Sequence, residues 1–167
     1  MEALRNLTLC EVNRRIHDEQ EEIRLDFLSA LLVLDWAQAR LCFDRFRQEF
    51  SLHVKREEAH VLPSLRTLLE KREEPREKWD AHLQGDHVIL QRSLTRIDDT
   101  LRALSESRAS HRDLARELDT FVQLGRVLEH HHQREDRVIY PHLDENLSPE
   151  DVETLKNALI DADLVQV

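Results

Sequence analysis

The stretch HVKREEAHVLP, residues 53–63, returns later in the same chain as HHQREDRVIYP, residues 131–141. The two align without a gap. Each contains a histidine, a glutamate four residues after it and a proline six residues after the glutamate. Residues four apart on an α-helix project from the same side, one turn apart. The repeated phrase therefore predicts two helices, each presenting one histidine and one glutamate in the same direction.

The composition is that of one helical domain. The chain has 167 residues, and no Gly/Ser-rich linker divides it. It contains only two glycines and four prolines, whereas leucine, arginine, glutamate and alanine are abundant. We therefore expect an all-α protein rather than a β-sandwich or a disordered chain.

Charge and hydropathy indicate which partners and which cell compartment to expect. A formal net charge of −10, with Lys and Arg scattered among Asp and Glu, argues against nucleic acid as a partner. The first residues lack the pattern of a signal peptide, and the longest apolar run, residues 30–34, is too short to span a membrane. Cys10 and Cys42 form no CxxC pair, so two reduced thiols near the core are expected. These features indicate a cytoplasmic protein.

Apolar residues recur at helical spacing in long stretches separated by short polar breaks. The stretches cover residues 12–34, 35–63, about 79–104 and 110–141, and the charged run KREEPREK, residues 71–78, follows the second. Asp35 is expected to cap the second helix, and Pro63 to bend or end it. The sequence SPEDVETLKNAL predicts a further short helix with Ser148 as N-cap, Pro149 first in the helix and Asp151 closing a capping box.

Long helices joined by short connections pack most simply as an up-down-up-down four-helix bundle with the apolar faces inward. We expect this bundle over residues 1–147, with a short C-terminal helix over residues 148–167 packed on it. His53 and Glu57 continue an apolar face rich in phenylalanine, and His131 and Glu135 continue one rich in leucine. The bundle therefore buries both pairs.

Burying two carboxylates and two imidazoles costs several kcal/mol unless partners satisfy their charge and lone pairs. No Lys or Arg lies on these faces, so metal ions are the simplest cations, and imidazole with carboxylate suits iron, manganese or zinc. His17 and His87 lie early in the first and third helices, level with His53 and His131 in an antiparallel bundle. Four histidines and two glutamates at one height suit a pair of metal ions bridged by carboxylates.

These residues make the chain resemble the hemerythrin-like, HHE cation-binding family. The resemblance rests on His17, on D86-H87 and on the paired motif H-x-x-x-E-[ED]-x-x-x-x-P, and it spans roughly residues 10–147. It implies a four-helix bundle of the up-down type, of which myohemerythrin is an example. It also implies a non-haem di-iron centre, oxo- or hydroxo-bridged, with manganese or zinc as possible occupants. The implied terminal ligands and bridges are His17, His53, His87 and His131, and Glu57 and Glu135.

One departure from the family bears on function. Oxygen-carrying hemerythrins have an H-x-x-x-H pair on the third helix, whereas His82 and His87 are five residues apart and point about 140° from each other. The set of four histidines and two glutamates is closer to that of the di-iron proteins of iron-centre repair, although their small cysteine-bearing domain is missing here. We expect reaction with, or sensing of, O₂, NO or peroxide, possible roles being stress response and iron-centre repair.

Several neighbours of the expected ligands have open roles. For Glu21 a solvated surface position is favoured over a ligand. Glu58 and Asp136 follow the bridging glutamates by one residue, so they are expected to contact ligands or form salt bridges rather than bind metal. Tyr140 is expected to pack near the bundle end, with a hydrogen bond to bound dioxygen as the alternative. The histidines expected to lie outside the site are His60, His111, His130, His132 and His142.

Other interpretations stay open at this point. One is a reversible oxygen-binding hemerythrin, and another is a metal-free helical module that binds a protein partner. A ferritin-like iron store is disfavoured, because that architecture uses E-x-x-H spacing with four glutamates. The sequence does not decide whether the protein is an enzyme or what its oligomeric state is.

Overall fold

The computed structural model describes residues 6–71 and 79–160, and within these ranges the chain is helical with no strand. The prediction of an all-α protein is confirmed. Residues 72–78 of the predicted charged break and residues 161–167 of the predicted C-terminal segment lie outside the described residues. The α-helices are α1 (Leu9–Leu32), α2 (Trp36–Arg56), α3 (Leu62–Lys71), α4 (Asp80–Glu106), α5 (His111–Arg134), α6 (Tyr140–Asn146) and α7 (Pro149–Ile160).

Side-chain caps fix where several helices begin. The carboxylate of Asp35 accepts a 3.0 Å hydrogen bond from the backbone N–H of Gln38, as predicted. Ser148 caps α7 through the N–H of Asp151, and Pro149 is the first helical residue, also as predicted. Helix α1 begins at Leu9, earlier than expected, because Thr8 forms a capping box with the glutamate three residues later.

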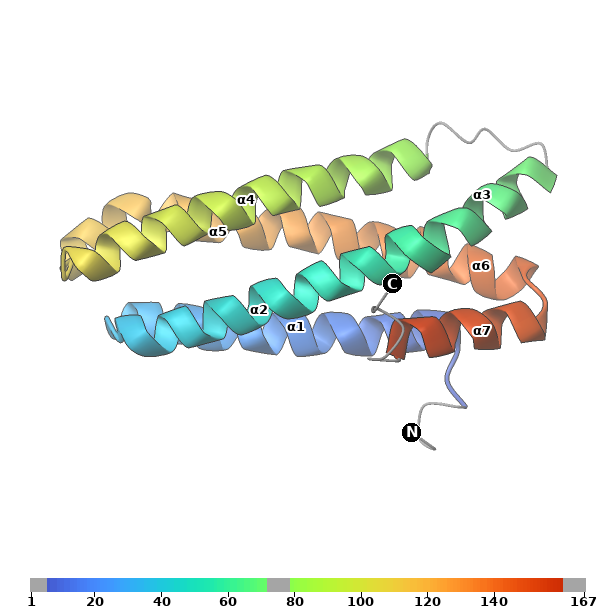
Figure 1. Cartoon of the computed structure of the whole chain (residues 1–167), viewed down its shortest axis with the longest axis horizontal. Coiled ribbons are helices and arrows are strands. Elements are labelled where there is room, and N and C mark those ends of the chain that lie inside the picture. Colours follow the sequence, from blue (N-terminus) through green and yellow to red (C-terminus); the bar gives the residue numbers. More distant parts are fainter. Residues whose placement is uncertain (1–5, 72–78, 161–167) are drawn as a thin grey trace.

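The same tight turn joins α1 to α2 and α4 to α5. In the first, the N–H of Asp35 reaches back to the carbonyl of Ala30, and Leu34 adopts the left-handed conformation with φ 56°. In the second, the N–H of Ala109 bonds the carbonyl of Leu104, and Arg108 has φ 49°. This is the Schellman arrangement, which satisfies the last carbonyls of a helix and reverses the chain. Each turn therefore produces an antiparallel pair of helices (Figure 1).

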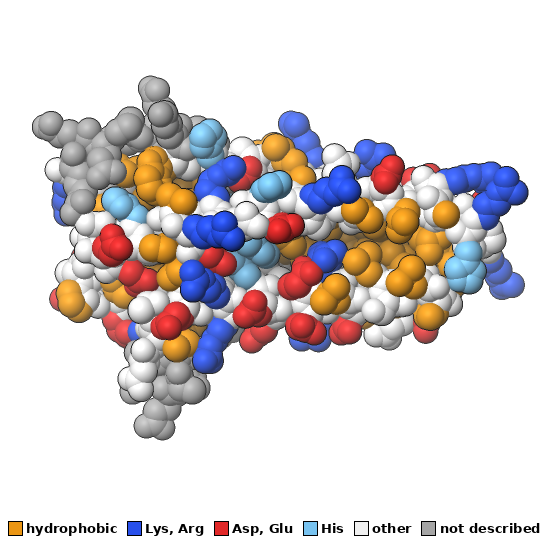
Figure 2. All heavy atoms as spheres, turned by 180° about the vertical axis from the view of Figure 1, so that it is seen from behind, with side chains coloured by type: hydrophobic (Ala, Val, Ile, Leu, Met, Phe, Trp, Pro, Cys, Tyr) orange, Lys and Arg blue, Asp and Glu red, His pale blue; other side chains and the backbone are white. Residues whose placement is uncertain are grey.

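The two helix pairs lie side by side along the long axis of the molecule, with α7 folded back along one end (Figure 1). Basic and acidic side chains are interspersed on the face formed by α1 and α5 (Figure 2). None of the described helices is long and apolar enough to cross a membrane.

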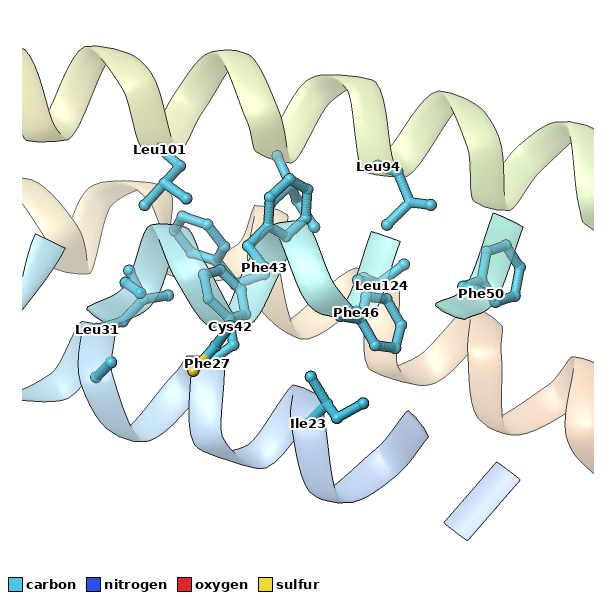
Figure 3. Packing of buried hydrophobic residues seen from close by; sticks show 14 of the residues in the cluster. Ile23, Phe27, Leu31, Cys42, Phe43, Phe46, Phe50, Leu94, Leu101 and Leu124 are labelled. Atoms are coloured by element: carbon cyan, nitrogen blue, oxygen red, sulfur yellow. The ribbon is translucent and has the colours of Figure 1, made fainter. Parts of the chain in front are cut away.

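The apolar interior is divided into two clusters. One fills the half of the molecule near the two tight turns and is rich in phenylalanine, including Phe27, Phe43, Phe46 and Phe50 (Figure 3). The other lies toward α7 and combines residues from the helix ends, including Leu9, Leu62, Leu65, Ile139, Tyr140, Leu143 and Leu159. Along each long helix, the buried histidines and glutamates lie between the residues of these two clusters. The polar layer is therefore enclosed by apolar packing at both ends.

The helices continue through both motif prolines, so Pro63 does not end its helix, and the alternative that it bends the helix stays a prediction. A π-helical turn precedes each proline, η2 (Glu57–Val61) and η4 (Glu135–Ile139). The N–H of Leu62 bonds the carbonyl of Glu57, and the N–H of Tyr140 bonds that of Glu135. Proline lacks an N–H and crowds the carbonyl four residues before it, so the ladder must loosen there. The loosened turn begins at each glutamate of the repeated motif.

Candidate metal centre

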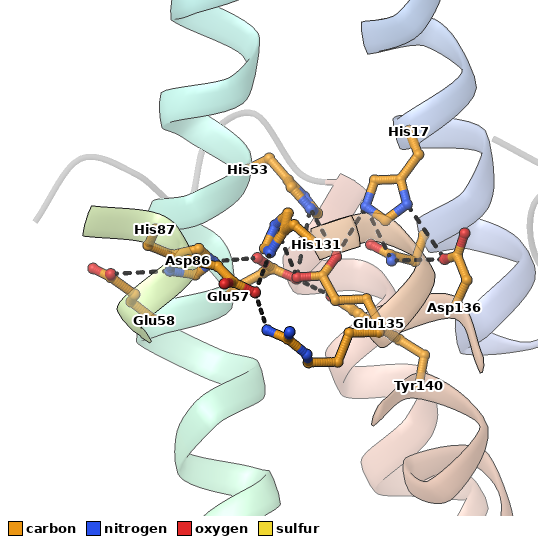
Figure 4. A network of polar contacts seen from close by, with 12 residues as sticks. His17, His53, Glu57, Glu58, Asp86, His87, His131, Glu135, Asp136 and Tyr140 are labelled. Atoms are coloured by element: carbon orange, nitrogen blue, oxygen red, sulfur yellow. Dashed lines mark hydrogen bonds and ion pairs between the residues drawn. The ribbon is translucent and has the colours of Figure 1, made fainter. Parts of the chain in front are cut away.

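The structure brings all six predicted ligands together in the polar layer (Figure 4). They come from α1, from α2 and its π turn, from α4, and from α5 and its π turn. None of the six is more than 4% exposed. Their assignment as metal ligands remains a prediction that the arrangement supports.

Glu135 lies between histidines of three helices. Its Oε2 is 3.0 Å from Nε2 of His17 and 4.0 Å from Nε2 of His53. Its Oε1 is 3.1 Å from Nε2 of His131. The two oxygens of one carboxylate thus face two different groups of imidazoles, which is the arrangement of a bridging ligand.

Glu57 lies opposite Glu135 but has different surroundings. Its Oε2 is 3.2 Å from Nε2 of His87, and its Oε1 is 3.5 Å from Nε2 of His53. The hydroxyl of Tyr140 donates a 2.7 Å hydrogen bond to Oε1 of Glu57. One oxygen of Glu57 is therefore already engaged by a protein donor.

The ligand atoms form two groups that share Glu135. In each group the atoms lie within 4.8 Å of one another. The first, which we name the His87/His131 position, consists of Glu57, His87, His131 and Glu135. The second, the His17/His53 position, consists of His17, His53 and Glu135. This second donor set, two histidines and one carboxylate, is typical of non-haem iron sites with open coordination positions.

Most of the inward-facing ligand atoms have no hydrogen-bond partner within the described residues. These atoms are both oxygens of Glu135, Oε2 of Glu57 and Nε2 of His53, His87 and His131. Buried polar atoms are normally satisfied, because leaving them unpaired costs the desolvation energy of each group. Orphaned atoms that converge from α2, α4 and α5 and their π turns fit cations between them. The residues present therefore suit a pair of metal ions.

Carboxylates lie beside Nδ1 of three of the four histidines, and the contact of Glu58 with His87 is a hydrogen bond. Asp136 Oδ1 lies 3.3 Å from Nδ1 of His17, and Glu58 Oε1 lies 3.2 Å from Nδ1 of His87. Asp86, itself ion-paired with Arg134, lies 3.8 Å from Nδ1 of His131. A carboxylate at Nδ1 keeps the proton there and turns Nε2 toward the metal.

The fourth histidine differs. Nδ1 of His53 is buried and, among the described residues, has neither a hydrogen-bond partner nor a carboxylate in ion-pair contact. Glu58 and Asp136 thus contact histidines, as the sequence predicted, although each serves the histidine of a neighbouring helix rather than that of its own motif.

The protonation of these groups reflects the density of carboxylates. Burial lowers the pKa of His17, but its contacts with Asp136 and Glu135 outweigh burial and raise the pKa to about 9. Burial lowers the pKa of His87, but Glu57, Glu135 and Glu58 together outweigh burial and raise it. Burial raises the pKa of Glu135, but His131, His17 and His53 together hold it well below its ordinary value. Without metal, the proton that His17 keeps up to a pKa of about 9 offsets part of the charge of the carboxylates.

A groove between α1 and α5 reaches the centre from outside. Its volume is about 440 Å³, and His17 and His132 are among the residues that line it. Figure 2 shows this face, with histidine side chains visible within the hollow. Arg24 also lines the groove, held by two hydrogen bonds to Glu21 and lying against Gly125. The groove thus extends to His17, one of the two histidines of the His17/His53 position.

The structure changes the expectation for His132 and supports that for Glu21. His132, expected outside it, stacks on His17 with ring centroids 3.6 Å apart and planes 8° apart. Burial and the neighbouring His17 lower the pKa of His132 to about 2, so it is neutral. Glu21 pairs with Arg24 and is partly exposed, in agreement with the favoured surface position.

The remaining histidines lie away from the ligand groups. His82, His111 and His130 are exposed, and His60 and His142 are partly exposed. Sequence reasoning also missed Asn13 and Gln20, which are buried on the inner face of α1 on either side of His17. The helical spacing of both from His17 was the available signal, but their polarity made this face of the helix look solvated.

Comparison with known proteins gives one match. The family model described as the hemerythrin HHE cation binding domain matches residues 80–163, half of the chain. The matched range contains His87, His131 and Glu135, while the other three predicted ligands lie before it. No curated protein and no solved structure matches significantly.

Proposed function

Because the chain belongs to the hemerythrin HHE cation-binding family, we propose that its buried histidines and glutamates hold two metal ions. The observation that carries this proposal is that two ligand groups share Glu135, so that one carboxylate can serve both ions. A metal-free interaction module would have to keep the carboxylates of Glu57 and Glu135 buried with only protonated imidazole to offset their charge.

We propose iron as the metal, in a non-haem di-iron centre. Imidazole and carboxylate donors also suit manganese and zinc, so the family supplies the preference for iron. Iron, when bound, supplies a change of oxidation state and an open coordination position for a small ligand. The chain itself orients the imidazoles through Asp86, Glu58 and Asp136 and restrains Glu57 through Tyr140.

The proposed reaction partners are O₂, NO or peroxide, which the protein would react with or sense in stress response or iron-centre repair. Support comes from the size of the entry: a groove beside His17 admits a small molecule, whereas apolar clusters close both ends of the polar layer. Reversible oxygen carriage is less well supported, because His82 is exposed and offers no fifth histidine to the centre.

We also infer that the helices form an up-down-up-down four-helix bundle over residues 1–147 and that residues 148–167 form an appendage to it. The two antiparallel pairs, α1 with α2 and α4 with α5, support the bundle. Helix α7 contacts α1 and α2 near the buried Leu155 and Leu159, which supports a packed appendage.

Metal analysis and absorption spectra of the purified protein test the proposal. We expect two irons per chain and, after exposure to air, the charge-transfer bands of an oxo-bridged ferric pair. Glu135→Gln should lose most of the metal, because it removes the shared carboxylate, whereas the exposed Glu106→Gln should keep it. A stably folded protein that binds no metal contradicts the proposal.

The proposed reactivity has a separate test. Stopped-flow mixing of the reduced, iron-loaded protein with O₂ should show oxidation of the centre without recovery of O₂. A stable oxygenated species that released O₂ on deoxygenation would instead favour reversible carriage.

A further inference from the structure

Gln20 is a buried amide that the protein leaves unsatisfied. It lies on the inner face of α1 and is 1% exposed. Neither its Nε2 nor its Oε1 has a hydrogen-bond partner within the described residues, and both atoms are buried. Such a group is destabilising in an apolar interior, so its presence requires an explanation.

The position of Gln20 directs it toward the centre. It follows His17 by three residues on the same helix face, and helical side chains lean toward the N-terminus of their helix. Its side chain therefore leans over the turn that carries His17. The next inner residues of α1, Ile23 and Phe27, belong to the phenylalanine-rich cluster (Figure 3). Gln20 thus stands between that cluster and the His17/His53 position.

The other half of the internal repeat shows which kind of residue occupies the position equivalent to Gln20 when only packing is needed. His87 in the pair α4 and α5 corresponds to His17 in the pair α1 and α2. Three residues after His87 stands Leu90, which is fully buried. Leu83 stands four residues before His87, and Asn13 stands four residues before His17. Both are fully buried. Leucines therefore flank His87, whereas amides flank His17.

The second amide is also incompletely satisfied. Asn13 Nδ2 lies 3.2 Å from Nε2 of His17 and 3.3 Å from Asp136 Oδ1, while its Oδ1 has no partner within the described residues. The two metal positions thus differ in the polarity of the residues on either side of His17 and His87. The residues one turn before and after His87 are apolar, whereas those beside His17 are amides whose hydrogen-bonding capacity the described residues use only in part.

We propose that Gln20 donates a hydrogen bond, through Nε2, to a small ligand bound at the His17/His53 position. This inference rests on the proposed metal centre and narrows its ligands to small molecules whose outer atom accepts a hydrogen bond, anions above all. The ligand enters by the groove between α1 and α5, which His17 lines. At the His87/His131 position, Leu90 provides no such donor.

The experiment uses azide, a small anion that accepts hydrogen bonds, as the probe. Azide is titrated into the iron-loaded wild-type protein and into Gln20→Leu, which copies the residue of the other half. We expect about tenfold weaker azide binding at unchanged iron content, the size expected for one hydrogen bond to an anion. Gln20→Met, which keeps the length of the side chain, should show the same loss.

Leu90→Met is the matched control, because it alters packing at the equivalent place beside His87 without changing polarity. Its azide affinity should remain within about twofold of wild type, since no hydrogen bond is removed. A loss in this control as large as that in Gln20→Leu would overturn the inference, because repacking alone would then explain the effect.

A second readout separates ligand binding from a structural role. In the metal-free protein, Gln20→Leu should raise the melting temperature, because it replaces an unsatisfied amide by an apolar side chain. A lowered melting temperature would overturn the inference, as would wild-type azide affinity in an iron-loaded Gln20→Met. If the wild-type protein bound no metal, the proposed function would fail; unchanged azide binding at full iron content rejects the role of Gln20 alone.

Discussion

Tyr140 and Glu57 are linked by a 2.7 Å hydrogen bond across 83 residues of sequence, and the other half of the repeat has no counterpart to it. The residue that aligns with Tyr140 is Leu62, which has no hydroxyl to donate. Glu57 therefore has one oxygen restrained by a hydroxyl, whereas both oxygens of Glu135 face imidazoles. Two glutamates that the sequence makes equivalent are unequal in the structure.

Removing this hydroxyl should destabilise the metal-free protein. Burial raises the pKa of Tyr140 well above its ordinary value, so the phenol stays protonated and donates at every working pH. In Tyr140→Phe the buried Oε1 of Glu57 loses its donor, and we expect the free energy of unfolding to fall by about 1–3 kcal/mol. Urea denaturation of both proteins in a chelator measures the difference. An unchanged midpoint would mean that the bond contributes nothing to the metal-free fold.

The carboxylate behind His17 should strengthen metal binding. Asp136→Asn keeps the size of the side chain but removes the charge beside Nδ1 of His17. We expect the affinity for Zn²⁺ to fall by about 10- to 100-fold in competition with a chromophoric chelator. The exposed Asp99→Asn, which changes the net charge equally, serves as the control. Equal losses in both variants would point to overall charge rather than to orientation of the imidazole.

The metal-free protein should lose stability as the pH rises. The pKa of His17 is raised to about 9 in the folded chain, so its stabilising contribution is full below about pH 6.5 and is lost as the pH passes through about 9. We expect the melting temperature in a chelator to fall by about 5 °C or more between pH 6.5 and 9. With Zn²⁺ bound the metal replaces the proton, so the fall should largely disappear. A flat metal-free profile would contradict the raised pKa.

The two glycines give a paired test of the groove. A Cβ at Gly85 would meet nothing within 4 Å, whereas one at Gly125 would lie 3.0 Å from Nη1 of Arg24. Gly85→Ala should therefore stabilise α4 by about 0.5–1 kcal/mol through helix propensity alone. Gly125→Ala should gain less, because the guanidinium that pairs with Glu21 must move. Chemical denaturation of both variants checks this; an equal gain would show that Arg24 moves without cost.

Much of the fold and of the candidate site followed from periodicity. A helical spacing of four places His53 beside Glu57 and His131 beside Glu135, and this geometry holds for any regular helix. The breaks in the apolar pattern located the helices, and Asp35 and Ser148 were visible as caps. Thr8 and Glu11 carried the same kind of signal, so the early start of α1 could also have been predicted.

The missed features depend on contacts between helices. His132 is one residue from a predicted ligand, and only the position of α1 against α5 brings its ring onto His17. Gln20 resembles a surface residue because polar amides are usually solvated, and its burial becomes visible only once α1 is placed. The π turns reflect a local conflict between proline and the helical ladder, which an apolar pattern does not record.

Each π turn also acts as a spacer between two registers. Glu57 must point into the centre, while Leu62, Leu65 and Leu69 must pack in the cluster near α7. A π turn holds one residue more than an α turn between the same two hydrogen-bonded groups, here the carbonyl of Glu57 and the N–H of Leu62. Deleting that residue would close the turn to α-helical spacing and leave the leucines of α3 in register, whereas a deletion within the regular part of α3 would rotate the residues beyond it by about 100°. A single-codon deletion in this segment would therefore remove the π turn while keeping both the direction of the carboxylate and the packing at the far end of the molecule.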